Sequence, residues 1–165
     1  MELIQHTLNW VKGEIVEATI MAIFGAIIVA CGVLCWTLGT TPHAKALTIP
    51  LLIVGCIPLF MGISGVITNK RSVPVYQAAW KQNQQQFILG EKARVEGFDQ
   101  IFKYSYPAAI IFVIGGAILF FLLNSSHWKA ISLAMMVMGL MAYFIDHFAA
   151  ERAEIYLKHI EGALG

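Results

Sequence analysis

Hydrophobic residues gather into four long blocks along the chain, separated by short polar segments. The blocks cover residues 18–38, 46–68, 106–123 and 130–145. A helix of about twenty apolar residues, rising about 1.5 Å per residue, can cross a hydrocarbon core about 30 Å thick. The pattern therefore predicts an all-α, polytopic membrane protein with four transmembrane helices.

The segments between the blocks predict how the spans are connected and oriented. Residues 39–45 and 124–129 are too short for anything other than a turn, so the first two spans and the last two spans should each form a hairpin. The turns hold only Lys45 and Lys129, whereas the other Lys and Arg residues lie in the terminal and middle segments. By the positive-inside rule, both termini and the middle segment are predicted to be cytoplasmic, most simply in a bacterial inner (plasma) membrane.

Three polar segments outside the spans carry apolar residues at helical spacing. Residues 3–15 have the stripe expected of an amphipathic helix that rests in the membrane interface. Residues 69–104 predict one amphipathic cytoplasmic helix, or two with a break at Gly90. The last span should continue as a helix that lies on the membrane or on a partner, with Glu154 and Lys158 forming a stabilising i,i+4 pair.

The chain matches itself when it is shifted by 84 residues. Residues 43–46 (His-Ala-Lys-Ala) then lie over residues 127–130 (His-Trp-Lys-Ala), and glycines coincide in the spans at Gly32 and Gly116 and at Gly55 and Gly139. We interpret this as two copies of one unit, residues 1–71 and 72–165, within one membrane domain. Units that cross the bilayer an even number of times share one orientation, which predicts a parallel repeat about an axis along the membrane normal. The alternative is chance similarity among apolar segments with a small alphabet.

The composition and charge of the chain exclude some classes of protein and of binding partner. Of the 165 residues, 58% are hydrophobic and 13% charged, against roughly 45–50% and 25% in soluble domains, which excludes an ordinary water-soluble domain. Eleven Lys and Arg residues face ten Asp and Glu residues without forming a basic patch, so no nucleic acid is expected to bind. The expected partners are the lipid bilayer and either another protein or further copies of this chain.

One group of polar residues is a candidate site at the cytoplasmic ends of the first and fourth spans. It consists of Glu14, Glu17, Asp146, His147 and Glu151. Carboxylates and imidazoles from neighbouring helices can hold a transition metal or relay protons. The Glu-x-x-His spacing of di-iron proteins is absent, however, and a salt-bridged helix end that includes Arg152 explains the same residues. We therefore predict no cofactor.

The two turns hold a second, simpler pair of candidates. His43 and His127 occupy equivalent positions in the repeat and could meet to bind a metal or sense pH. Two histidines without further ligands make a poor metal site, so we favour exposed interfacial imidazoles beside the lysine anchors.

No nucleotide-binding glycine loop, nucleophile elbow or zinc-protease signature occurs, which lowers the expectation of an enzyme. We therefore favour a non-enzymatic membrane protein that acts through helix contacts, as an accessory subunit, assembly factor or toxin-immunity protein does. Tyr76, Trp80 and Phe98 are the candidate anchors for a partner. The alternatives are a small oligomeric transporter or channel, and a membrane enzyme or metal site at the polar group.

Overall fold

The computed structural model describes residues 2–164, except for the side chain of Asp99, and consists of four long α-helices. They are α1 (Leu3–Leu38), α2 (Pro42–Gln82), α3 (Gln84–Leu122) and α4 (Ser126–Leu164). Within the described range there is no β-strand. Each helix is long and apolar enough to cross a membrane. The prediction of an all-α chain with four candidate membrane-spanning helices is confirmed.

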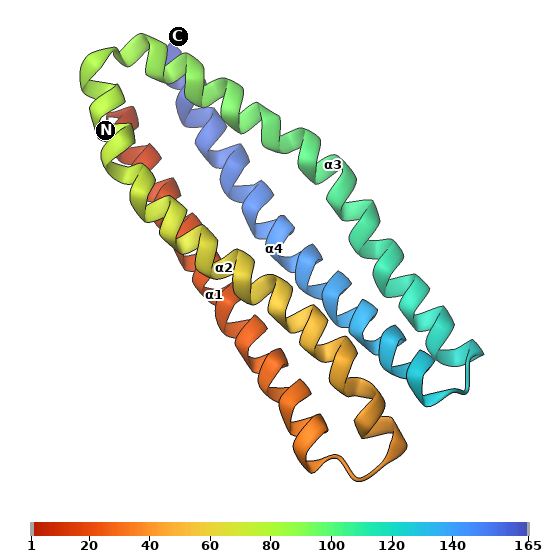
Figure 1. The fold of residues 1–165 in the computed structure, drawn as a ribbon. Helices are drawn as coiled ribbons and strands as arrows, with labels where there is room; N and C mark the ends of the chain where they lie inside the picture. Colours follow the sequence, from red (N-terminus) through yellow and green to blue (C-terminus); the bar gives the residue numbers. More distant parts are fainter. Residues whose placement is uncertain (1, 165) are drawn as a thin grey trace.

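The helices lie side by side as two antiparallel pairs, α1 with α2 and α3 with α4 (Figure 1). The short connections within the pairs lie at one end of the molecule, and both termini and the α2–α3 connection lie at the other. Between the pairs, α4 contacts both α2 and α1. At the first connection, Thr41 caps α2 by accepting a 3.2 Å hydrogen bond from the Ala44 N–H, and Pro42 occupies the first turn, where its missing N–H is harmless.

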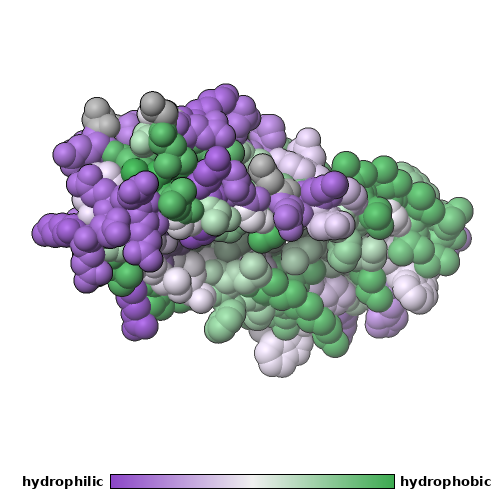
Figure 2. Space-filling model, turned by 90° about the horizontal axis from the view of Figure 1, so that it is seen from above, coloured by the Kyte–Doolittle hydropathy of each residue, from purple (hydrophilic) through white to green (hydrophobic). Residues whose placement is uncertain are grey.

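The helices are 36 to 41 residues long, about twice what a bilayer requires. Figure 2 shows hydrophilic residues gathered over one end of the molecule and hydrophobic residues over the other. We call the end formed by residues 2–17, 69–104 and 146–164 the polar bundle. The remainder of the four helices is the apolar half.

The N-terminal stripe does not rest on a membrane surface, which corrects the prediction of an interfacial helix. Residues 3–38 form one continuous helix, and Leu3 and Trp10 belong to a core inside the polar bundle. The other buried members of that core come from α3 and α4 and are Val95, Ala153, Tyr156 and Ile160. Helical periodicity shows that an apolar stripe must be shielded from water, but it does not show whether lipid or protein shields it. In the C-terminal segment, Ala153, Tyr156 and Ile160 of the apolar stripe are likewise buried within the chain, whereas Leu164 is exposed. The predicted Glu154–Lys158 pair is present at 2.8 Å.

The middle segment breaks at Asn83 and not at Gly90, which lies inside α3. Asn83 has an extended backbone (φ −157°, ψ 101°), and its N–H donates to the Ala79 carbonyl at the end of α2. Its side chain then accepts from the Gln86 N–H at 3.0 Å and caps α3. Asparagine binds free backbone donors in this way, whereas a glycine inside a helix costs only about 1 kcal/mol. The unit boundary drawn after Arg71 therefore falls inside a continuous helix.

Glycines allow the helices of each pair to approach until their backbones touch. A Cβ atom on Gly25 would lie 2.4 Å from the Leu59 nitrogen, and one on Gly62 would lie 2.5 Å from the Ala18 carbonyl oxygen. Between α3 and α4, a Cβ on Gly116 would lie 2.8 Å from the Ser132 carbonyl oxygen. Such contacts are typical of helices in lipid, where no hydrophobic effect drives them together.

Two adjacent glycines in α3 provide a matched test of this packing. We expect Gly116→Ala to lower the free energy of unfolding by about 1–3 kcal/mol, because the new methyl group overlaps the α4 backbone. Gly115→Ala meets no atom within 4 Å and should be neutral or raise stability by up to about 1 kcal/mol through helix propensity. Unfolding in detergent micelles, followed by circular dichroism, measures both. Equal destabilisation by the two substitutions would contradict the packing.

Candidate functional site

An ion cluster that contains part of the predicted polar group joins α1 and α4 within the polar bundle. Arg152 donates from Nη2 to Glu14 Oε1 at 3.1 Å and also forms an ion pair with Glu17. Gly13 leaves room for this arrangement, since a Cβ there would lie 2.9 Å from Cδ of Arg152. All three charged side chains are half-buried. Glu14, Glu17 and Arg152 therefore form a clamp between the first and last helices.

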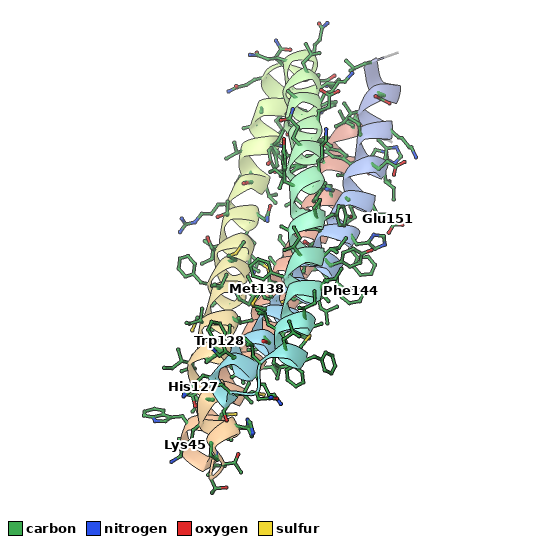
Figure 3. The ribbon with its side chains drawn as sticks, turned by 90° about the vertical axis from the view of Figure 1, so that its right-hand side faces the viewer. Lys45, His127, Trp128, Met138, Phe144 and Glu151 are labelled. Atoms are coloured by element: carbon green, nitrogen blue, oxygen red, sulfur yellow. The ribbon has the colours of Figure 1, made fainter. Side chains whose placement is uncertain are left out.

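Among the other members of the predicted group, Asp146 lies near the clamp. Burial raises the pKa of Glu17, and the charge of Asp146 contributes to this rise. The Asp146 carbonyl oxygen accepts from the Tyr106 hydroxyl at 3.3 Å and ties α4 to α3. His147 is exposed, with its ring parallel to that of Tyr143. Glu151 is also exposed and lies on the outer side of α4 (Figure 3). Among residues 2–164, leaving out the side chain of Asp99, no three His, Cys, Asp or Glu side chains are placed to hold a metal.

The electrostatics of the clamp favour a structural ion cluster. Burial raises the pKa of Glu17, although the hydrogen bond and charge of Arg152 act in the opposite direction. For Arg152, burial alone would lower the pKa, but the hydrogen bonds and charges of Glu17 and Glu14 outweigh it and raise the pKa. The guanidinium therefore stays protonated. Because this cation occupies the space between the two carboxylates, the geometry fits the salt-bridged helix end.

A second polar cluster, more deeply buried, links three helices inside the polar bundle. The Tyr156 hydroxyl on α4 donates to Glu91 Oε2 on α3 at 2.8 Å and lies 2.6 Å from Thr7 Oγ1 on α1. Glu91 also accepts from Nε of Arg94 at 3.0 Å. The side chains of Thr7, Glu91 and Tyr156 are all buried. We call Thr7, Glu91, Arg94 and Tyr156 the tyrosine cluster.

Aromatic rings surround the tyrosine cluster and shield its charges. The Arg94 guanidinium lies 4.3 Å from the centre of the Trp10 ring and 5.2 Å from that of Tyr76, which is favourable cation–π geometry. The Trp10 ring also stacks on Tyr156, with centroids 5.2 Å apart. Burial opposes the charge of Arg94, but the hydrogen bonds and charge of Glu91 raise its pKa overall. Burial likewise raises the pKa of Tyr156, so the phenol remains neutral and donates.

The three predicted partner anchors are used within the chain. Trp80 and Phe98 are half-buried and pack against the core of the polar bundle, and Tyr76 packs edge-on against Phe87 while facing Arg94. Most of the large apolar side chains that remain exposed lie in the apolar half, and others, such as Val75 and Leu89, lie on the polar bundle.

Sequence reasoning missed the tyrosine cluster because its members lie far apart in the chain. Tyr156 is 65 residues from Glu91 and 149 residues from Thr7. One signal was available, since the 84-residue shift places Glu91 on Thr7 and Arg94 on Trp10. If the 84-residue repeat includes the polar segments, Glu91 and Thr7 occupy equivalent helix faces, as do Arg94 and Trp10.

Two histidines stack at the open end of the polar bundle. The rings of His6 on α1 and His159 on α4 have centroids 3.7 Å apart. Desolvation, followed by the charge of His159, lowers the pKa of His6. The stack therefore favours the neutral form of His6. The turn histidines His43 and His127 are both exposed.

Comparisons of the chain with protein-family models, with curated proteins and with solved structures found no match.

The tyrosine cluster can be tested by removing one oxygen atom. Tyr156→Phe keeps the ring stacked on Trp10 but removes one buried hydrogen-bond partner from Glu91 and one from Thr7, which should lower the free energy of unfolding by about 1–3 kcal/mol. Tyr104→Phe is the control, because that side chain is 75% exposed. Denaturant unfolding in detergent compares the two variants. A Tyr156→Phe protein as stable as the control would show that the cluster does not hold the helices together.

Proposed function

We propose that this chain is a small, non-enzymatic integral membrane protein that acts through helix contacts with another membrane protein. The observation that carries the proposal is its outward apolar surface. Only 11–22% of the most apolar stretch of each helix is buried within the chain. Large side chains such as Phe60 and Phe121 are 75% and 82% exposed. Such surfaces must be covered by lipid or by protein, and large aromatic side chains are common anchors at protein interfaces.

The polar clusters fit the same proposal. The charged groups of the clamp pair with one another, and so do those of the tyrosine cluster. Both clusters join helices of this chain. Their role is then to hold four long helices in register so that the apolar half presents fixed outward faces. The second candidate function is a transporter or channel that is assembled from several copies of this chain. The membrane-enzyme alternative has less geometric support, because His147 and Glu151 are exposed and only Glu14 and Glu17 of the predicted group pair with Arg152 among the described side chains.

We further propose that the polar bundle and both termini are cytoplasmic in the inner membrane of a bacterium. The distribution of charge supports this orientation. Arg94 and Arg152 are held within the polar bundle, whereas the opposite end has only Lys45 and Lys129. An excess of Lys and Arg is typical of cytoplasmic segments.

The proposed duplication is supported by the ends of the helices and by their contacts. Adding 84 to the end of α1, Leu38, reaches the end of α3, Leu122, and adding it to Pro42, the start of α2, reaches Ser126, the start of α4. The glycine contacts correspond as well. Gly55 approaches Gly25 and Val29 in one pair, and Gly139 approaches Ala109 and Val113 in the other.

The partner proposal predicts a complex of constant stoichiometry. The tagged full chain, extracted into mild detergent or native-lipid nanodiscs, should retain one other membrane protein at a constant ratio. Phe60→Ala and Phe121→Ala test two outward faces, and the face that contacts the partner should lose at least tenfold in recovery, since an anchoring aromatic typically contributes about 2 kcal/mol or more. Thermal stability should not change. Recovery of the chain alone, or only with further copies of itself, would overturn the proposal.

The orientation is tested by thiol labelling of intact cells. Cys31, Cys35 and Cys56 are first replaced by alanine, and single cysteines are then introduced as Thr40→Cys in the first turn and Gln85→Cys near the α2–α3 connection. A membrane-impermeant maleimide should label the turn in intact cells and the second position only after permeabilisation. The reverse pattern would place the polar bundle outside.

A further inference from the structure

The apolar half contains a groove between the two helix pairs. It has a volume of about 580 Å³ and is lined mainly by α2 and α4, with Phe112 contributed by α3. Its walls are almost entirely apolar, including Ile49, Ile53 and Met138. Two polar side chains, Lys45 and His127, stand at its mouth, next to the turns. Figure 3 shows Lys45 and His127 at the same end of the molecule, with Met138 deeper along the helices.

The mouth of the groove lies where a membrane surface would be. Trp36 and Trp128, near the two turns, are 70% and 48% exposed, and tryptophan gathers at the headgroup level of membranes. From Lys45 to Ile57 the groove follows α2 for about 18 Å at about 1.5 Å per residue, close to half of a hydrocarbon core about 30 Å thick. The groove therefore spans the depth of one leaflet.

The shape of the groove fits an acyl chain. Its volume of about 580 Å³ extends over about 18 Å along α2, and its walls are almost entirely apolar. A single extended hydrocarbon chain can lie along this space.

The charge of the side chains at the mouth of the groove determines which lipid headgroup is electrostatically complementary to it. No Asp or Glu occurs between residues 18 and 90 or between residues 100 and 145, so the turn end of the molecule has no carboxylate to neutralise Lys45. Lys129, the other lysine at this end, faces the Phe120 ring and does not line the groove. A phosphate placed beside Lys45 and His127 would receive charge-assisted hydrogen bonds.

We infer that the groove between α2 and α4 is a binding site for one anionic phospholipid, with an acyl chain between the helix pairs and its phosphate beside Lys45 and His127. The bound lipid fills the space between the pairs in the leaflet that contains the turns. This inference requires only that the turns lie at a membrane surface, so it can hold or fail independently of the proposed protein partner.

The site is tested by native mass spectrometry of the full chain after equilibration with phosphatidylglycerol or phosphatidylcholine carrying the same acyl chains. The wild-type protein should retain one phosphatidylglycerol molecule in preference to phosphatidylcholine. Lys45→Gln should reduce this preference about fivefold, the effect of one basic residue on an anionic lipid. Lys129→Gln removes the same charge from the same end but outside the groove, and should leave the preference within twofold of the wild-type value.

Steric variants test the groove itself. Ile53→Trp places an indole in the groove at a side chain that is 56% exposed, and should abolish retention of the lipid. Ile63→Trp is the control on the same helix, because Ile63 is 49% exposed and lies outside the groove. Equal losses for the two lysine variants, or for the two tryptophan variants, would indicate general contact with membrane lipid and overturn the inference. Release of a bound protein by Ile53→Trp, with lipid retention unchanged, would overturn it as well.

Discussion

The structure depends on the requirement that backbone hydrogen bonds be satisfied where water is absent. In a hydrocarbon core an unpaired N–H or C=O group is very costly, and an uninterrupted helix pairs all of them internally. The described helices are continuous over 36 to 41 residues each, and short connections such as those at Thr41 and Asn83 separate them. The prolines inside α2 and α3, such as Pro58 and Pro107, are local exceptions, because each lacks the N–H that would pair with a carbonyl one turn earlier. Because the helices continue past the apolar half, packing inside the membrane also sets the positions of the polar side chains beyond it.

The two halves of the molecule are held together by different forces. In the apolar half, close backbone contact at Gly25, Gly62 and Gly116 replaces the hydrophobic effect, which is weak between helices in lipid. In the polar bundle, water restores the hydrophobic effect, and Leu3, Trp10 and their neighbours form a conventional core. The groove lies between the two tightly packed helix pairs, and Lys45 stands at its mouth. The glycine contacts named above lie within the pairs and do not close this space.

The tyrosine cluster gives the polar bundle one preferred register. A buried carboxylate without partners is strongly unfavourable, so Glu91 is stable only when Arg94 and Tyr156 are both in place. Sliding α3 by one turn against α4 would separate Glu91 from Tyr156. The clamp of Arg152 on Glu14 and Glu17 acts similarly between α1 and α4. Together these contacts would turn four flexible spans into a rigid body whose outward faces are suited to recognition.

The amino-acid sequence was sufficient to predict the four candidate spans and the Glu154–Lys158 pair, because these follow from local hydropathy and helical spacing. It could not show what covers the amphipathic stripes, since lipid, a partner and the chain's own helices satisfy the same periodicity. The contact of Leu3 with a core and the hydrogen bond between Tyr156 and Glu91 are seen only in the folded chain. The physical reason is that burial and ion pairing depend on contacts between residues distant in sequence, which local patterns do not record.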